Sequence, residues 1–90
     1  MDRKMAAKRI AIAPHALFEM RRRGISQAEL EAVVRNPQQI LPSRKGRHIH
    51  QSKLPPGQML LRAVVKEDAQ VYHVITAYKT SKIAKYWKQP

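Results

Sequence analysis

The chain changes character at Asn36-Pro37, and this change constrains its fold more than any other feature of the sequence. Before this point apolar residues recur at helical spacing, as in Leu30, Val33 and Val34. After it, short apolar runs alternate with turn-forming stretches. A residue that precedes proline is biased away from the helical conformation, so the helical part should end here. The sequence therefore predicts helices first and strands afterwards.

The N-terminal part carries signals for two helices joined by a glycine. Pro14 suits the first turn of a helix, because its missing N–H would be unpaired there in any case. Gly24 can take the left-handed conformation that ends a helix, and Ser26 with Glu29 forms a capping box for the next one. We predict a charged arm over 1–12 and two helices within 14–35, at 14–23 and 27–35.

The second part contains four runs with strand character, separated by Arg44-Lys45-Gly46, Pro55-Pro56-Gly57 and Glu67-Asp68-Ala69. Links this short require antiparallel neighbours, because a parallel crossover needs about a dozen residues or more. The expected fold is a single α+β domain, in which two N-terminal helices pack on one face of a four-stranded antiparallel sheet. The predicted strands, within 38–78 of the domain 1–90, are 38–41, 47–51, 58–66 and 70–78, followed by a basic aromatic tail over 79–90.

Strict alternation would divide the last strand between two faces. The more apolar face should pack beneath the helices, which leaves Thr76 and Tyr78 on the open face. On the preceding strand Arg62 should share that open face, so that an arginine, a hydroxyl and a phenol converge where a phosphate could bind. The expected core residues of these two strands are Met59, Leu61, Ala63, Val65, Val71, His73, Ile75 and Ala77, and Tyr72 and Val74 are expected to join Thr76 and Tyr78.

Positive charge dominates the chain, with 18 Lys and Arg against 6 Asp and Glu and a formal net charge of +12. The stretch after Ala69 contains four lysines, three tyrosines, one tryptophan and no Asp or Glu, so a ligand there should be anionic. Aromatic rings beside such charges offer stacking surfaces for bases. RNA, either tRNA or mRNA, is therefore the first partner to consider.

Composition excludes several other classes of protein. There is no cysteine, so disulfides and thiolate metal sites are ruled out and the chain suits a reducing compartment, with the cytoplasm as the expected site of action. The apolar runs are too short for a transmembrane helix, so we expect no membrane partner. His48 and His50 share a strand face but lack a third ligand, so we predict no metal and no cofactor.

Cleavage of RNA without a metal needs a base, cations that stabilise the phosphorane and an acid for the leaving oxygen. His15 shares a helix face with Glu19 and Arg22, so Glu19 could orient the imidazole while Arg22 holds a phosphate. A purely structural interpretation is also open. His15 could pack at the helix start, and the run Arg21-Arg22-Arg23 could complement the helix dipole.

Four segments resemble a small bacterial domain family of unknown function (DUF4258-like), related to the barnase, EndoU, colicin and RelE (BECR) group of ribonuclease toxin folds. The segments are HALFEMRRRGIS at 15–26, Asn36-Pro37, VITAYKTSK at 74–82 and KYW at 85–87. The resemblance implies N-terminal helices followed by a four-stranded antiparallel sheet. It also implies a metal-independent ribonuclease in a toxin–antitoxin or polymorphic toxin system.

Together these observations predict a toxin-type ribonuclease that cleaves by attack of the 2'-OH. Alternatives are a non-catalytic nucleic-acid-binding module and a protein-interaction module, and an acidic antitoxin or immunity protein would fit the positive charge. In the ribonuclease hypothesis His15 acts as base or acid, and Tyr78 or Thr76 donates to a phosphate oxygen. The predicted catalytic residues are His15, Arg22, Thr76 and Tyr78, and the predicted nucleic-acid-binding residues are Arg62, Lys79, Thr80, Lys82, Lys85, Tyr86 and Trp87.

Overall fold

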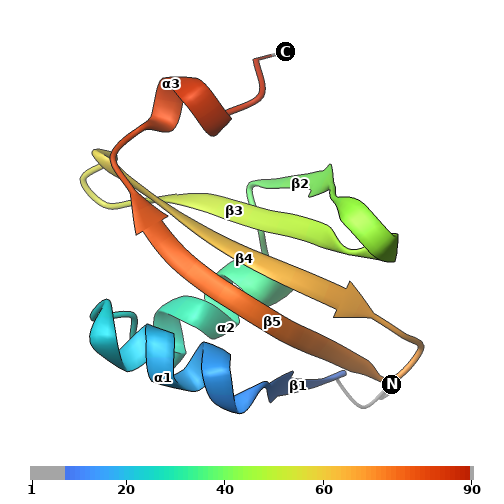
Figure 1. Ribbon diagram of the computed structural model, residues 1–90. Helices are drawn as coiled ribbons and strands as arrows, with labels where there is room; N and C mark the ends of the chain where they lie inside the picture. Colours follow the sequence, from blue (N-terminus) through green and yellow to red (C-terminus); the bar gives the residue numbers. More distant parts are fainter. Residues whose placement is uncertain (1–7, 90) are drawn as a thin grey trace, which may run out of the picture.

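The computed structural model describes residues 8–89, which form an α+β domain with one mixed sheet (Figure 1). Strands β2 to β5 and helices α1 and α2 lie close to their predicted positions. The elements are β1 (Arg9–Ile12), α1 (Pro14–Arg22), α2 (Gln27–Arg35), β2 (Gln39–Pro42), the 3-10 turn η1 (Arg44–Gly46), β3 (His48–Leu54), β4 (Met59–Glu67), β5 (Val71–Thr80) and α3 (Ile83–Tyr86).

The sheet has five strands in the order β1-β5-β4-β3-β2, so the prediction of four antiparallel strands was incomplete. The four predicted strands are antiparallel to their neighbours, whereas β1 runs parallel to β5. The charged arm predicted over 1–12 is therefore wrong at Arg9–Ile12, and residues 1–7 lie outside the described part of the chain. Ile10 and Ile12 pack against the core and give this short strand its place.

The two N-terminal helices form as the local signals predict. Ser26 Oγ accepts a hydrogen bond from the Glu29 N–H at 3.0 Å, and Glu29 Oε1 accepts one from the Ser26 N–H at 3.0 Å, which completes the capping box. Gly24 has φ +69°, a left-handed conformation that joins the helices without a steric cost. Both helices cover one face of the sheet (Figure 1). The core between them contains Ala16, Met20, Ile25, Leu30, Val33, Val34, Leu61, Ala63, Val65, Val74 and Ala77.

A β-bulge in β5 interrupts the alternation that the sequence analysis assumed. Val64 pairs with Thr76 and Val65 pairs with Val74, so Ile75 is an extra residue in β5. Val74 consequently belongs to the helix-side core with Ala77, although the two are three residues apart.

The predicted faces of β5 are therefore right for its second half and wrong for its first. Tyr72 and Val74 pack at the helix side, instead of lying on the open face. Val71 and His73, which alternate with them, lie on the opposite side, and Ile75 lines a pocket there with His73. In contrast, Ala77 is in the core as predicted, and the Tyr78 hydroxyl lies on the far side from the helices, where it contacts Arg62.

The C-terminal end differs from the predicted tail over 79–90. Strand β5 extends through Lys79 and Thr80, and the next residues form α3, a single helical turn. Figure 1 shows α3 beyond the end of β5, on the side of the sheet away from α1 and α2. The face that was expected to be open is thus partly covered. Within residues 8–89, no helix combines the length and the apolar character needed to cross a membrane.

The β4–β5 turn is organised by the Asp68 carboxylate. Asp68 Oδ1 accepts hydrogen bonds from the N–H groups of Gln70 and Val71, each at 2.8 Å. Asp68 Oδ2 lies 3.0 Å from Nε2 of His73. The hydrogen bond from Gln70, followed by those from His73 and Val71, lowers the pKa of Asp68 to about 2.

Because this pKa lies below the ordinary value of 3.8, ionised Asp68 stabilises the fold above about pH 3.8 and loses that contribution as the pH falls toward 2. We expect Asp68→Ala to lower the thermal midpoint at pH 6, and the gap to the wild type to narrow between pH 4 and about pH 2. Thermal unfolding followed by circular dichroism measures this gap. Glu31→Ala, at an exposed carboxylate, is the matched control; a gap for Asp68→Ala that stays constant down to about pH 2 would contradict the assignment.

Candidate nucleic-acid interface

Four polar side chains form a row across the face of the sheet opposite α1 and α2. The strand register places Gln39 opposite Gln51, Gln51 opposite Arg62 and Arg62 opposite Tyr78, so β2 to β5 each contribute one residue. Residues directly opposite each other on neighbouring strands are close enough for their side chains to interact. We call Gln39, Gln51, Arg62 and Tyr78 the polar row.

Arg62 is the centre of the polar row and is only 5 % exposed. Its Nε donates to Gln51 Oε1 at 2.8 Å, and one terminal nitrogen donates to the Tyr78 hydroxyl at 2.5 Å. The guanidinium carbon lies 4.0 Å from the ring centroid of Tyr86, so the cation stacks on this ring. The predicted meeting of Arg62 with Tyr78 is therefore present, but beneath a third residue.

Among residues 8–89, Arg62 has no carboxylate within ion-pair distance. The acidic side chains that form pairs do so elsewhere: Glu19, Glu29, Glu67 and Asp68 contact cations on other parts of the surface. Within the described part of the chain, Arg62 is thus a buried cation held by an amide oxygen, a hydroxyl and aromatic rings.

The C-terminal segment is fixed to the sheet mainly by the polar row. Gln51, which is fully buried, donates to the Tyr86 carbonyl at 3.1 Å and to Gln39 Oε1 at 2.7 Å. Gln39 in turn donates to the Lys88 carbonyl at 2.7 Å and accepts from the Lys88 N–H at 3.0 Å. The ring of Tyr86 also meets that of Tyr78 edge to face, with centroids 6.5 Å apart.

Lysines and aromatic rings alternate at the surface of this segment. Lys53 Nζ lies 4.3 Å from the ring centroid of Trp87, and Lys85 Nζ lies 5.2 Å from that of Tyr86. The four lysines are exposed and both rings are half-buried. We call this set the basic-aromatic surface; its members are Lys53, Lys82, Lys85, Tyr86, Trp87 and Lys88.

Three other predicted residues of β5 are divided between the two sides of the sheet. Lys79 points toward the helices, where its Nζ donates to the Gly24 carbonyl at 3.0 Å and lies 3.7 Å from Glu29 Oε1. Thr80 Oγ1 accepts from the Lys82 N–H at 3.1 Å and so shapes the turn into α3. Thr76 is half-buried opposite Val64. The structure therefore does not bring Lys79 to the basic-aromatic surface.

His15 and Arg22 lie on α1, at the helix side of the sheet. Both are exposed, whereas Glu19 between them is 8 % exposed and bonds to Arg22 at 2.7 Å and to Arg23 at 3.0 Å. The hydrogen bond from Arg22 holds the pKa of Glu19 below its ordinary value, and the nearby positive charges add to this effect while partial burial opposes it. Since the sheet lies between α1 and the polar row, the structure does not bring His15 together with Tyr78.

The two histidines of β3 have separate environments. His50 is buried on the helix side, where its Nδ1 lies 2.9 Å from the Val34 carbonyl, and desolvation by burial lowers its pKa despite this contact. His48 is exposed. In the part of the chain that the structure describes, no group of three or more His, Cys, Asp or Glu side chains could hold a metal ion.

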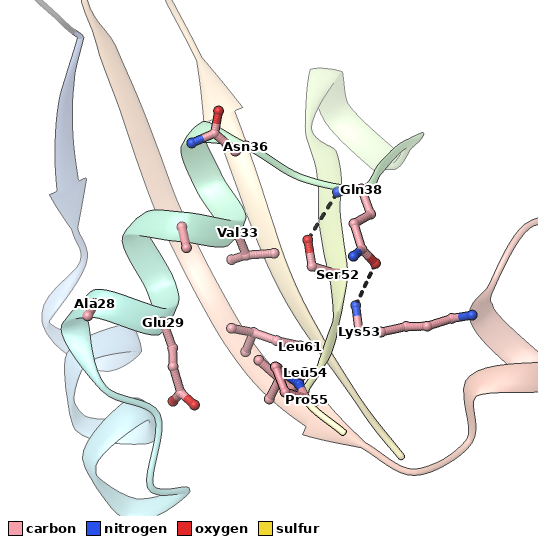
Figure 2. A pocket seen from close by; sticks show the side chains of 11 residues that line it. Ala28, Glu29, Val33, Asn36, Gln38, Ser52, Lys53, Leu54, Pro55 and Leu61 are labelled. Atoms are coloured by element: carbon pink, nitrogen blue, oxygen red, sulfur yellow. Dashed lines mark hydrogen bonds between the residues drawn. The ribbon is translucent and has the colours of Figure 1, made fainter. Parts of the chain in front are cut away.

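A groove of about 440 Å³ lies between α2 and the C-terminal half of β3 (Figure 2). Its floor is apolar and includes Val33, Leu54 and Leu61. The Gln38 side chain accepts from the Lys53 N–H at 2.9 Å and so occupies the sheet edge just before β2 begins. Figure 2 shows the Lys53 side chain pointing away from the groove, which leaves its charge for the basic-aromatic surface.

Sequence reasoning missed four residues of this interface: Lys88 in the C-terminal segment, and Gln39, Gln51 and Lys53 on strands. Polar residues on a strand usually indicate a solvated face, and nothing in their spacing distinguishes them from such a face. One weak signal was present, because β3 (HIHQSKL) lacks the alternating apolar pattern of a strand with one covered face.

The fold and this surface define a class: small basic α+β domains with a mixed five-stranded sheet and a C-terminal segment that folds over it. Residues 12–85 match a family model described as Domain of unknown function (DUF4258), and the chain belongs to that family. The matched stretch runs from the end of β1 into α3 and includes the whole polar row. No curated protein and no solved structure matches the chain.

The polar row should contribute measurably to stability. In Gln51→Leu the side-chain volume is retained but the Arg62 Nε loses its acceptor, and an unsatisfied buried donor costs about 1–3 kcal/mol of unfolding free energy. Urea unfolding measures this loss. Gln58→Leu changes an exposed glutamine and is the control. Equal, small effects of both substitutions would show that the Gln51 hydrogen bonds are not needed for the fold.

Proposed function

We propose that the protein binds RNA through the basic-aromatic surface. The observation that carries this proposal is that Lys53 and Lys85 lie over the rings of Trp87 and Tyr86, with Lys82 and Lys88 exposed in the same segment as the rings. The lysines come from β3 and from the segment after β5, so folding brings together charges that are far apart in the sequence.

RNA suits this surface better than an anion without bases would, because RNA offers both phosphates and stacking groups. Lysines bind phosphates by releasing counterions, while base stacking on an aromatic side chain contributes about 1–3 kcal/mol per base. The side chains of Tyr86 and Trp87 are half-buried, so part of each remains accessible to unpaired bases, which are the usual target in RNA recognition. The expected partner is thus single-stranded RNA or a loop of tRNA or mRNA.

A second candidate function is metal-independent RNA cleavage of toxin type. The hydrogen bond between Tyr78 and Arg62 favours it, because a phenol beside a guanidinium can donate to a phosphate oxygen while the cation stabilises the phosphorane. The resemblance to the barnase, EndoU, colicin and RelE ribonuclease toxins supports it as well. In that setting an acidic antitoxin or immunity protein would be attracted by the net charge of +12. The acid–base role of His15 stays a prediction.

RNA binding is tested with a fluorescently labelled single-stranded RNA and anisotropy at several salt concentrations. We expect the double variant Lys82→Ala/Lys85→Ala to weaken binding and to reduce the salt slope by about 1.4, since each single-strand phosphate contact contributes about 0.7. The control is Arg21→Ala/Lys66→Ala, which removes the same charge from exposed positions outside the surface. Equal losses in the two double variants would mean that net charge alone drives binding.

Cleavage is tested by incubating the protein with total RNA in EDTA and detecting cyclic-phosphate ends. If Tyr78 donates to the reacting phosphate, Tyr78→Phe should lower the rate by about 10²-fold, the lower range for a general acid or base. A loss confined to His15→Ala would move the reaction to the helix side of the sheet. Intact RNA with the wild-type protein would end the ribonuclease candidate and leave RNA binding untouched.

A further inference from the structure

We propose that residues 82–88 cover a phosphate-binding site centred on Arg62, and that a phosphate group displaces this cover when it binds. We call residues 82–88 the C-terminal cover. The inference rests on the proposed function only in naming RNA as the source of the phosphate. The site itself follows from contacts of Arg62, Gln51 and Tyr78, which are all buried or half-buried beneath Tyr86.

Arg62 has no carboxylate counterion among the described residues. A buried cation is usually paired with a carboxylate, because desolvation of an unpaired charge is costly. On the helix side even exposed or half-buried cations have carboxylate partners: Glu19 pairs with Arg22 and Arg23, and Glu29 lies beside Lys79. Among the described residues, Arg62 has only neutral partners. Within residues 8–89, an anion is therefore the component that the immediate surroundings of Arg62 lack.

Arg62 and Tyr78 offer hydrogen-bond donors suited to a phosphate. The guanidinium is a planar fork of donors that matches the geometry of a phosphate, and the Tyr78 hydroxyl beside it can donate a further hydrogen bond. Gln51 accepts the hydrogen bond from Nε and so restrains the orientation of the guanidinium. Fixing the fork before a ligand arrives reduces the entropy lost on binding.

The C-terminal cover is attached to the sheet by few contacts. No residue of α3 is buried, and its single turn is too short to be a stable helix by itself. The side-chain hydrogen bonds that hold the backbone of the cover to the sheet come from Gln51, from Gln39 and, at Lys82, from Thr80. The ring of Tyr86 completes the contact by stacking on Arg62. Displacing the cover exposes the site without disturbing the core between the helices and the sheet.

The C-terminal cover itself carries positive charge. Lys82, Lys85 and Lys88 are exposed on it, so after displacement these cations remain tethered close to a phosphate bound at Arg62. Tethering gives them a high effective concentration at the ligand. Once displaced, the cover would help to bind a polyanion such as RNA, because a chain of phosphates can contact Arg62 and the lysines together.

The experiment uses inorganic phosphate as the probe and Trp87 as the reporter, since this residue is the only tryptophan of the chain and lies on the cover. Phosphate should change the Trp87 emission in a saturable way, whereas chloride at equal ionic strength should not. Arg62→Gln should abolish the response. Circular dichroism establishes that this variant is folded.

Two variants test the cover without altering Arg62. Tyr86→Ala removes the stacked ring and Gln39→Ala releases Lys88, so both should raise phosphate affinity, by about threefold or more if the site is covered most of the time. Tyr86→Phe keeps the ring and should bind as the wild type does. Weaker binding in Tyr86→Ala would make Tyr86 part of the site and overturn the cover.

A parallel titration with short single-stranded RNA separates this inference from the proposed function. A phosphate response that depends on Arg62, with no RNA binding, would keep the site and reject RNA as its ligand. RNA binding that is unaffected by Arg62→Gln would reject the covered site and keep the RNA-binding surface. Absence of a phosphate response even in Gln39→Ala would reject the site outright.

Discussion

The bulge at Ile75 is the constraint on which the two sides of the sheet depend. If β5 alternated strictly, a strand with Val74 in the core would also turn Thr76 and Tyr78 toward the helices. The extra residue resets the alternation, so the first half of β5 packs Tyr72 and Val74 at the helix side and the second half points Tyr78 at Arg62. One strand can thereby support both the apolar core and the polar row.

The two sides of the sheet treat charge differently. On the helix side the carboxylates of Glu19 and Glu29 accompany the arginines and Lys79, which ties α1, the Gly24 connection and β5 together. On the other side Arg62 and the lysines of the basic-aromatic surface have aromatic rings and amides as neighbours. Among the described residues, Arg62 and these four lysines form no ion pair where the C-terminal segment folds over the sheet, and this makes that side the candidate site.

Much of the fold could be predicted because its signals are local. The capping box at Ser26, Gly24 and the break at Asn36-Pro37 each act within a few residues, and short turns impose antiparallel pairing. Strand β1 could not be predicted, since its partner Val71–Val74 is remote in the chain and four residues show too little pattern. For the site, Arg62 and Tyr78 were correctly brought together, whereas Gln39 and Gln51 were missed because their role comes from contacts with the remote C-terminal segment, at Lys88 and Tyr86.

The sequence by itself determined the two helices, the antiparallel run of strands, the excess of positive charge and membership of the DUF4258 family, because these depend on local propensity, composition or motif. Tertiary structure alone decided which face each half of β5 presents, that β1 joins the sheet and that Arg62 lies beneath Tyr86. These features depend on one bulge and on contacts between distant segments. Whether a cation is buried or exposed is a property of what packs over it, and the residue type does not specify that.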